Sequence, residues 1–468
     1  MSMQFSGRVK ELGHIRSVLD RRESQWVRVT GIRGGGKSTL VEKVMAACGG
    51  LVHICPPLPS AAQYSFLRAS IDRLRTQKGL SPSDGLASGD WHGLFGSLTE
   101  VADPEGQPFV LVLDNAHRLA EARSRYEPAL RGAVLEAAAA GTVVHVVLVG
   151  QEAGIPTDTV LAPLPVETIT ISPLPFRVAA EHLPGVSPQD LVRAYGIFGG
   201  IPRVLSMLDP TVTLGTNVRR VILHHSAPLA DAGASWLERD VQTPARYFAI
   251  MSALASGESD WAAVHAGIPD LTKSGQVAPY LNRLAELGLV TARRPLDAKP
   301  GSRSTRYVIT DPFLAFWFRF VLSFRYAPGV ESESEYYTRF VRPELDVHLN
   351  SVFPSICRQH MTYDAIESIG ASARESGSLW GAGVDLPVSG ILTSGAAYYG
   401  TCHWAPPTRT DAPLDRLERS MRETRYGFGR QRRIRLVFSG TSAPRWLQRD
   451  VARHHDAQLI DAPALVGG

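Results

Sequence analysis

The chain has 468 residues, of which 44% are hydrophobic and 20% are charged, and its formal net charge at pH 7 is +4. These values are ordinary for a globular protein of about two to four domains. The small net charge excludes a protein that binds polyanions over its whole surface, so any contact with nucleic acid has to come from local basic patches.

The cysteines are scattered and show no C-x-x-C spacing, which favours neither a zinc site nor a disulfide scaffold and predicts a reduced, cytoplasmic compartment. They are Cys48, Cys55, Cys357 and Cys402. Residues 1–5 contain no apolar segment typical of a signal peptide. The apolar run 313–318 ends at Arg319 and is too short to span a bilayer, so we expect a buried helix there and no membrane partner.

A short apolar strand is predicted over 26–30 and an amphipathic helix over 39–45, after a first helix that carries Ile15, Val18 and Leu19. The intervening residues 31–38 read GIRGGGKS and fit the pattern G-x-x-x-x-G-K-[ST] of a phosphate-binding loop. Glycines let the backbone turn tightly and direct successive N–H groups at an anion in front of the helix.

This loop predicts a site for ATP and Mg²⁺. Lys37 would reach the β- and γ-phosphates, and the Ser38 hydroxyl would hold Mg²⁺. The residues expected around the nucleotide are Gly31, Arg33, Gly34, Gly35, Gly36, Lys37, Ser38 and Thr39. The alternative, a glycine-rich turn without a ligand, is less compatible with a strand before the pattern and a helix after it.

The next elements are a strand over 51–54, a helix over 62–75 and a loop over 79–90. A buried parallel strand is then predicted over 109–114, because five apolar residues end in Asp114. Ligands of α/β sheets bind at the carboxyl ends of the strands, so Asp114 is expected to hold Mg²⁺ directly or through water.

Asn115 follows, where many such ATPases have a glutamate that polarises the attacking water. An amide orients water but cannot accept its proton, and loss of a general base typically lowers a rate about 10²–10⁴-fold. We therefore expect slow hydrolysis, or binding without hydrolysis. Gln151 follows another apolar strand over 143–150 and is either a γ-phosphate sensor or a solvated loop residue.

Several segments together resemble the archaeal-type ATPases, a branch of the STAND/AAA+ P-loop NTPases. The matching segments are Phe5-x-Gly7-Arg8-x-x-Glu11-Leu12, the loop at 31–38, the strand ending in Asp114, Tyr195-x-x-x-Gly199-Gly200-Ile201-Pro202-Arg203, and Tyr307-x-Ile309-x-Asp311-Pro312-Phe313-Leu314-x-Phe316-Trp317. The resemblance implies an α/β protein with a RecA-like/AAA+ core (1–178), a helical lid (179–240), a winged helix (241–318) and a C-terminal domain like PD-(D/E)xK nucleases (319–468).

The resemblance also assigns roles to single residues. Gly7 and Arg8 would lie by the adenine, Pro202 would pack on the base, and Arg203 would approach the phosphates as a sensor. The chain departs from the family pattern at Asn115, and residues 163–167 contain no arginine where members often have one. An arginine finger given to a neighbouring subunit is therefore not expected.

The segment 244–311 is expected to form three helices, with 276–284 as candidate recognition helix, and then a basic hairpin. The candidate DNA-binding residues of this hairpin are Arg293, Arg294, Arg303 and Arg306. Winged helices also serve as protein-interaction or lid modules, and Pro279 is unfavourable inside a recognition helix. Contact with DNA and contact with protein both stay open.

In the C-terminal domain the nuclease pattern requires an Asp and then Glu-x-Lys on the following strand. Asp385 fills the first position, but Thr401 and His403 stand at the other two, so we expect a degenerate, inactive nuclease fold. The region 416–435 is expected to be helical and carries eight arginines. It is either a solvated helix face or a patch for nucleic acid or an acidic protein.

The sequence thus predicts an ATP-binding, slowly hydrolysing switch that acts on DNA or on a DNA-associated partner. Two alternatives remain. One is an ATP-driven DNA-processing enzyme with an active nuclease domain, and the other is a nucleotide-bound regulator that works through protein contacts alone.

Overall fold

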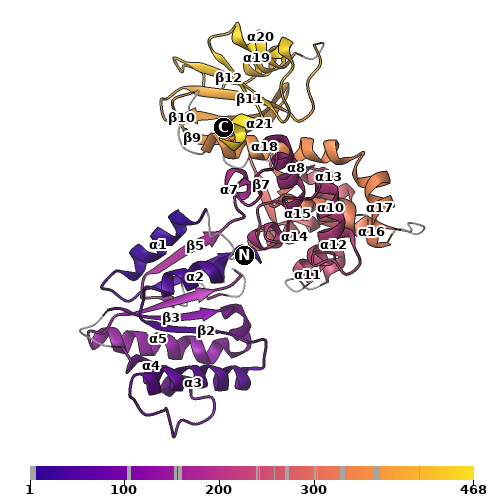
Figure 1. Ribbon diagram of the computed structural model, residues 1–468. Helices are drawn as coiled ribbons and strands as arrows, with labels where there is room; N and C mark the ends of the chain where they lie inside the picture. Colours follow the sequence, from indigo (N-terminus) through magenta and orange to yellow (C-terminus); the bar gives the residue numbers. More distant parts are fainter. Residues whose placement is uncertain are drawn as a thin grey trace. The chain divides into compact units, whose positions relative to one another are not determined.

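The computed structural model describes residues 7–102, 107–151, 155–156, 161–238, 241, 243–257, 259–268, 274–299, 302, 304–326, 332–362, 369–409 and 412–467. The chain separates into two compact units, Phe5–Ser172 and Pro173–Gly468 (Figure 1). Each unit has its own core. Among the described residues, no helix is long and apolar enough to cross a membrane.

The N-terminal unit is built on a five-stranded parallel sheet of order β2-β3-β4-β1-β5. Its strands are β1 (Trp26–Gly31), β2 (Gly50–Ile54), β3 (Phe109–Asp114), β4 (Val144–Val149) and β5 (Val166–Ile171). Its helices are α1 (Val9–Leu19), α2 (Lys37–Met45), α3 (Ser60–Gln77), α4 (Trp91–Thr99), η1 (Ala116–Ala122) and α5 (Arg123–Ala139). The predicted strands over 51–54, 109–114 and 143–150 are confirmed to within a residue.

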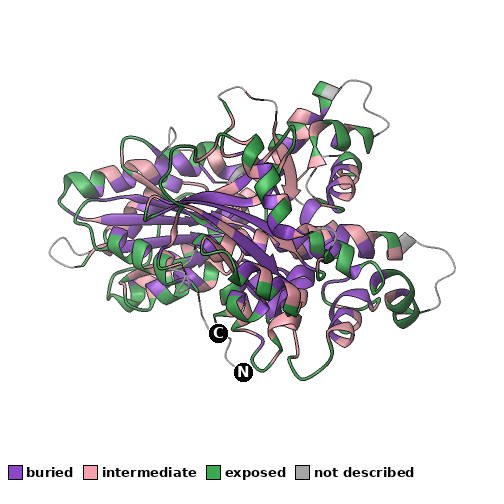
Figure 2. Cartoon of the chain, turned by 90° about the horizontal axis from the view of Figure 1, so that it is seen from above, coloured by how far each residue is buried: buried purple, intermediate pink, exposed green. Residues whose placement is uncertain are grey.

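Helices cover both faces of this sheet. On one face α1 and α2 pack on Val110 and Val112 of β3, and on the other α3, α4 and α5 pack on Leu111 and Leu113 of the same strand. Successive side chains of a strand point to opposite faces, so a strand covered on both faces needs an unbroken apolar run. Strands β1, β3 and β4 are accordingly buried almost throughout, and strands of this kind are purple in Figure 2.

The C-terminal unit begins with a helical array. Its helices are α7 (Phe176–Ala180), α8 (Pro188–Phe198), α9 (Pro202–Leu205), α10 (Leu214–Val218), η3 (Arg219–Leu223), α11 (Ala232–Glu238), α15 (Pro312–Phe316), η5 (Trp317–Val321), α16 (Leu322–Tyr326), α17 (Glu333–Tyr336), η6 (Tyr337–Val341) and α18 (Leu345–Thr362). The expected buried helix over 313–318 is present and continues as a π-helical turn, η5.

A small helix-and-strand module follows α11 in the chain. It comprises α12 (Pro244–Leu254), β6 (Ser259–Asp260), α13 (Trp261–Ala266), η4 (Ser274–Val277), α14 (Ala278–Glu286), β7 (Val290–Arg293) and β8 (Arg306–Ile309), with an antiparallel sheet of order β6-β8-β7. Pro279 lies in the first turn of α14 rather than inside the helix. A first-turn proline is tolerated because its missing N–H would have no helical partner there.

The last part of the chain forms a second five-stranded sheet of order β13-β12-β11-β10-β9. Its elements are β9 (Ala373–Gly381), β10 (Val384–Leu392), β11 (Ala397–His403), α19 (Pro413–Glu423), β12 (Arg433–Ser439), α20 (Arg445–Ala452), β13 (Ala457–Ile460) and α21 (Ala462–Val466). Strands β9, β10 and β11 are antiparallel, whereas β11, β12 and β13 are parallel. The sequence predicted helix across 416–435, and this is wrong beyond Glu423, because Gly427 and Gly429 have positive φ and β12 begins at Arg433.

Candidate functional site

The carboxyl ends of β1, β3 and β4 lie at one edge of the N-terminal sheet. Asp114 pairs with Val149 across β3 and β4, and β1 lies beside β4 in parallel register. The loop Gly31–Ser38 leaves β1 at this edge and leads directly into α2. The sequence motif and the predicted Mg²⁺ carboxylate therefore belong to the same edge of the sheet.

The glycines of the loop have backbone conformations that other residues rarely adopt. Gly31, Gly34 and Gly36 have φ values of +129°, +75° and +92°. A Cβ atom on Gly31 would also overlap the carbonyl oxygen of Ile171 on β5. The residue types are thus required by the backbone path, and Gly36 ends that path as the left-handed N-cap of α2.

Lys37 is the first residue of α2 and folds back over the loop. Its Nζ donates hydrogen bonds to the carbonyl oxygens of Gly31 (2.8 Å) and Ile32 (2.9 Å). Ser38 follows on the exposed side of the first helical turn, and Arg33 and Thr39 are half-buried. The ammonium group, the hydroxyl group and the first N–H groups of α2 thus gather at one helix N-terminus, which is suited to an anion.

Arg8 braces the loop from the side of α1. It is 5% exposed, and its guanidinium group donates to the carbonyl oxygen of Gly35 at 3.1 Å, to that of Ser172, and to Oε1 of Glu11 at 3.0 Å. These contacts fix the loop to the end of the last strand. Gly7, just before it, is exposed with a φ of +74°. The predicted position of Gly7 and Arg8 by an adenine ring stays a prediction.

Asp114 ends β3 with a carboxylate that is 7% exposed. Its Oδ1 accepts a hydrogen bond from the backbone N–H of Asn115 at 2.7 Å, and its carbonyl oxygen accepts one from the N–H of Cys55 at 2.8 Å. Asn115 has a φ of +57°, a left-handed conformation that asparagine tolerates better than most residues. The turn after β3 is thereby fixed with the carboxylate at the sheet edge.

The sequence did not single out His117, which lies in η1 close to this edge. Burial lowers its pKa, and the positive charges of Arg118, Lys37 and Arg33 lower it further, whereas Asp114 raises it. Its Nδ1 is buried and has no hydrogen-bond partner among the described residues. A Cβ atom on Gly150, the residue after β4, would lie 3.0 Å from this nitrogen. The sequence signal that could have identified His117 is its position as a polar side chain shortly after Asp114.

These residues fit a nucleoside triphosphate with Mg²⁺. The glycine cradle leaves backbone N–H groups uncovered by side chains, Lys37 supplies a positive charge, and Ser38 and Asp114 supply the oxygen ligands that Mg²⁺ prefers. Gln151, predicted as a possible sensor, follows Gly150 and is half-buried. Its role stays a prediction.

Pro202 and Arg203 belong to the C-terminal unit, where they begin α9. The turn before them is held from inside that unit, because the buried carboxylate of Asp311 accepts a hydrogen bond from Gly200 N–H at 3.1 Å and one from Phe313 N–H at 2.9 Å. The two motifs Gly199-Gly200 and Asp311-Pro312 are therefore joined to each other. The expected contacts of Pro202 and Arg203 with a nucleotide stay predictions.

The arm between β7 and β8, a candidate for contact with DNA or with protein, packs against the second sheet. Leu296 N–H donates to Ser378 O at 3.0 Å, Trp380 Nε1 donates to Ser304 O at 3.2 Å, and the Arg306 guanidinium lies 4.8 Å from the Trp380 ring centroid. Because β9 is an edge strand, the arm covers backbone groups that would otherwise be open for pairing.

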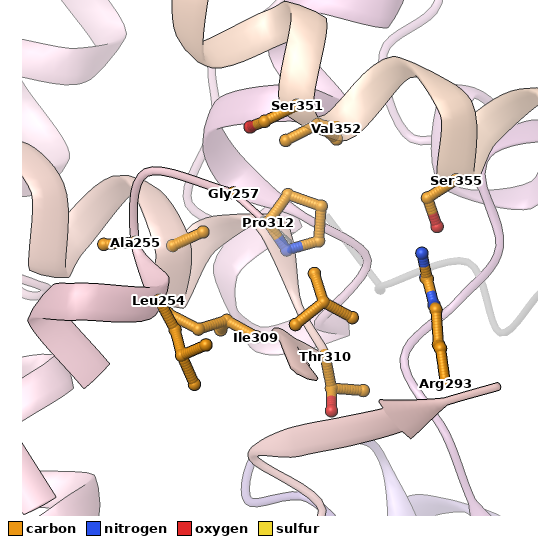
Figure 3. A pocket seen from close by; sticks show the side chains of 12 residues that line it. Leu254, Ala255, Gly257, Arg293, Ile309, Thr310, Pro312, Ser351, Val352 and Ser355 are labelled. Atoms are coloured by element: carbon orange, nitrogen blue, oxygen red, sulfur yellow. The ribbon is translucent and has the colours of Figure 1, made fainter. Parts of the chain in front are cut away.

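The arginines of this arm are consequently in different environments. Arg293 lines a cavity of about 30 Å³ and is directed at Ser355 of α18 (Figure 3), whereas Arg294 is exposed. Arg306 is stacked on Trp380, and Arg303 lies outside the described residues. The arm does not present its described arginines as one continuous basic surface.

The nuclease-like positions lie at one end of the β10–β11 pair. The ladder runs from Val388 opposite Gly400 to Ile391 opposite Ala397, so Asp385, Thr401 and His403 lie beyond its first rung. Thr401 Oγ1 is 3.2 Å from His403 Nε2, and Asp385 is exposed. Within the described part of the chain, no group of three or more His, Cys, Asp or Glu residues is arranged to hold a metal.

No family model matches the chain. An uncharacterized protein of Methanocaldococcus jannaschii is 20% identical over 369 residues, 76% of this chain and 77% of that protein. A Walker-type ATPase of Pyrococcus abyssi is similar over 67% of this chain and 95% of its own, with a TM-score of 0.51 and 16% identity. The Orc1 protein of Aeropyrum pernix, solved in complex with DNA, is similar over 69% of this chain and 93% of its own, with a TM-score of 0.34 and 14% identity. A TM-score of 0.34 is too low to support an inference from the Orc1 protein. The likeness to the Pyrococcus abyssi protein shows that 67% of this chain has the fold of a Walker-type ATPase.

Proposed function

We propose that this chain binds ATP with Mg²⁺ at the Gly31–Ser38 loop and works as a nucleotide-dependent switch of the AAA+/STAND type. The observation that carries the proposal is the meeting of the glycine cradle, Lys37 and the buried Asp114 carboxylate at one sheet edge. Lys37 and the N–H groups of the loop would bind the phosphates, and Ser38 and Asp114 would hold Mg²⁺. The bound ion would neutralise phosphate charge.

Hydrolysis is proposed to be slow. Asn115 cannot accept a proton, and its backbone N–H is already bonded to Asp114. His117 is the nearby side chain with a free ring nitrogen among the described residues, and we propose that it orients a water molecule or the terminal phosphate by hydrogen bonding. This role makes it a positioning residue, in a site where the ordinary base is missing.

Two modules of the C-terminal unit are proposed as the moving parts. The succession α12, β6, α13, α14, β7, β8 supports a winged helix, and the succession α18, β9, β10, β11, α19, β12 supports a nuclease-like fold. Thr401 and His403 in place of Glu and Lys argue against nuclease activity. Differential affinity of ATP for two arrangements would shift the population between them and so control a DNA or protein partner.

Isothermal calorimetry tests the site. Replacing Lys37 with alanine should abolish ATP binding, whereas Lys43→Ala, an exposed lysine further along α2, should leave it unchanged. Equal affinities of the two variants would refute the site. A plasmid-nicking assay with Mg²⁺ and with Mn²⁺ separates the switch from the alternative of an active nuclease, because only the latter predicts cleavage that Asp385→Ala removes.

A further inference from the structure

The loop between α19 and β12 carries an exposed phenylalanine, Phe428. The side chain of Phe428 is 80% exposed. A single exposed apolar residue is common on protein surfaces, so the exposed ring alone does not indicate a site. The surroundings of the ring decide which kind of partner fits.

The loop that carries this ring is anchored at several points. Tyr399 donates its hydroxyl proton to the carbonyl oxygen of Tyr426 at 2.6 Å, and the hydroxyl of Tyr426 donates to Glu375 Oε2 at 2.7 Å. Phe428 N–H donates to Arg425 O at 3.0 Å, closing a turn. Gly427 has a φ of +68°, and a Cβ atom there would overlap the Tyr399 hydroxyl. The ring is thus presented by a fixed turn.

The same loop is strongly basic. Residues 424–433 contain four arginines and no aspartate or glutamate. Arg425, Arg430 and Arg432 are exposed, and none of them forms an ion pair with a described residue. The guanidinium group of Arg433 lies 5.6 Å from the centroid of the Phe428 ring.

Two of the carboxylates close to this loop are paired with arginines outside it. Glu418 pairs with Arg422 at 2.6 Å, Asp456 pairs with Arg435 at 2.6 Å, and Glu375 accepts the Tyr426 hydroxyl. Glu375, whose charge the neutral Tyr426 hydroxyl does not cancel, and Glu423 at the end of α19 are fewer than the four arginines of the loop, so positive charge is in excess around Phe428. A ligand for this surface has to offer negative charge and a flat apolar face together.

We propose that the Phe428 loop binds single-stranded nucleic acid, with an unpaired base stacked on Phe428 and the neighbouring phosphates on Arg425, Arg430 and Arg432. Base stacking on aromatic side chains beside a positively charged surface is how proteins bind single strands without reading sequence. A duplex keeps its bases stacked on one another and offers no free face, and an acidic peptide offers charge with few rings. The site is separate from the loop Gly31–Ser38, which is named the ATP loop after its proposed ligand.

The test is fluorescence anisotropy of the full-length protein with a labelled oligothymidine of about 16 nucleotides. Phe428→Ala should weaken binding about 5- to 150-fold, the effect of losing one stacked base. Phe428→Leu should weaken it similarly, because leucine keeps the apolar character but has no ring, whereas Phe428→Trp should retain affinity. Phe66→Ala removes a phenylalanine that is 54% exposed on α3 and should change nothing.

The role of the arginines is tested by the salt dependence of oligonucleotide affinity. Replacing Arg430 and Arg432 with alanine should reduce the slope of log affinity against log salt by about 1.4, or about 0.7 for each lost phosphate contact with a single strand. The matched control replaces Arg73 and Lys78, two exposed cations of the N-terminal unit. Lys37→Ala should leave oligonucleotide binding intact, so failure here is distinguishable from failure of the ATP site.

Three results would overturn the proposal. They are wild-type affinity of Phe428→Leu, equal affinity for a duplex of the same sequence, and binding to phosphatidylserine vesicles or an acidic peptide with no binding to the oligonucleotide. Because Phe428, Arg430 and Arg432 are exposed, these variants are expected to fold, and circular dichroism checks this directly.

Discussion

Replacing Asp311 with asparagine should change how the stability of the C-terminal unit depends on pH. The Asp311 side chain is completely buried, and burial raises the pKa of its carboxyl group from 3.8 to about 7. The hydrogen bonds from the N–H groups of Gly200 and Phe313 lower the pKa but do not offset burial. The folded protein therefore holds this proton more tightly than the unfolded chain does.

The magnitude and sign follow from that difference. Between pH 4 and pH 7 the unfolded chain has lost the proton and the folded protein still keeps it, so the folded state binds more protons and its stability falls as pH rises. The shift from 3.8 to about 7 is about 3 units, and at 1.36 kcal/mol per unit the loss is roughly 4 kcal/mol. The contribution is fully present below about pH 4 and is lost as pH rises through about 7.

Urea unfolding followed by tryptophan fluorescence measures this effect. The Trp236 ring lies 5.6 Å from that of Phe313, two residues after Asp311, and reports on this region. Asparagine is neutral at every pH, so the stability advantage of the wild type over Asp311→Asn should shrink between about pH 4 and pH 8. Asp297→Asn, at an exposed position, should run parallel to the wild type. Parallel profiles for Asp311→Asn would refute the reasoning and indicate an ionised buried carboxylate.

The remaining predictions concern the proposed ATP site. Asn115→Glu should raise the steady-state ATPase rate if the missing base limits it, and an unchanged rate would mean that another step does. His117→Ala should lower that rate without weakening ATP binding by calorimetry, and a loss of both would assign His117 to folding. Gly31→Ala should destabilise the N-terminal unit by about 3 kcal/mol in thermal unfolding, because its φ is +129° and its Cβ would overlap Ile171. Gly49→Ala, which has nothing within 4 Å, should not.

The sequence predicts the N-terminal sheet well because its signals are local. A strand buried on both faces requires a continuous apolar run, and the runs 109–114 and 143–150 are of this kind. The loop before Lys37 is equally local at Gly34 and Gly36, whose φ values of +75° and +92° are requirements of the backbone at their own positions. Such features need no knowledge of distant partners.

The features that sequence reasoning missed depend on residues far apart in the chain. In the sequence Asp311 stands out only as part of a motif, whereas its partner Gly200 is 111 residues away. The sequence left contact of the basic arm with DNA and with protein both open, and the neighbours of the arm are Ser378 and Trp380 of an edge strand. His117 was missed because its significance comes from Lys37 and Arg33, which approach it only through the order of the parallel strands.

Arg8 has a consequence for communication along the chain. Its guanidinium group joins the carbonyl oxygen of Gly35, in the ATP loop, to that of Ser172, the last residue of the N-terminal unit. A displacement of the loop backbone would strain this bridge and pull on the peptide that continues into Pro173. One side chain therefore links the backbone of the loop that is proposed to bind phosphates to the residue before Pro173.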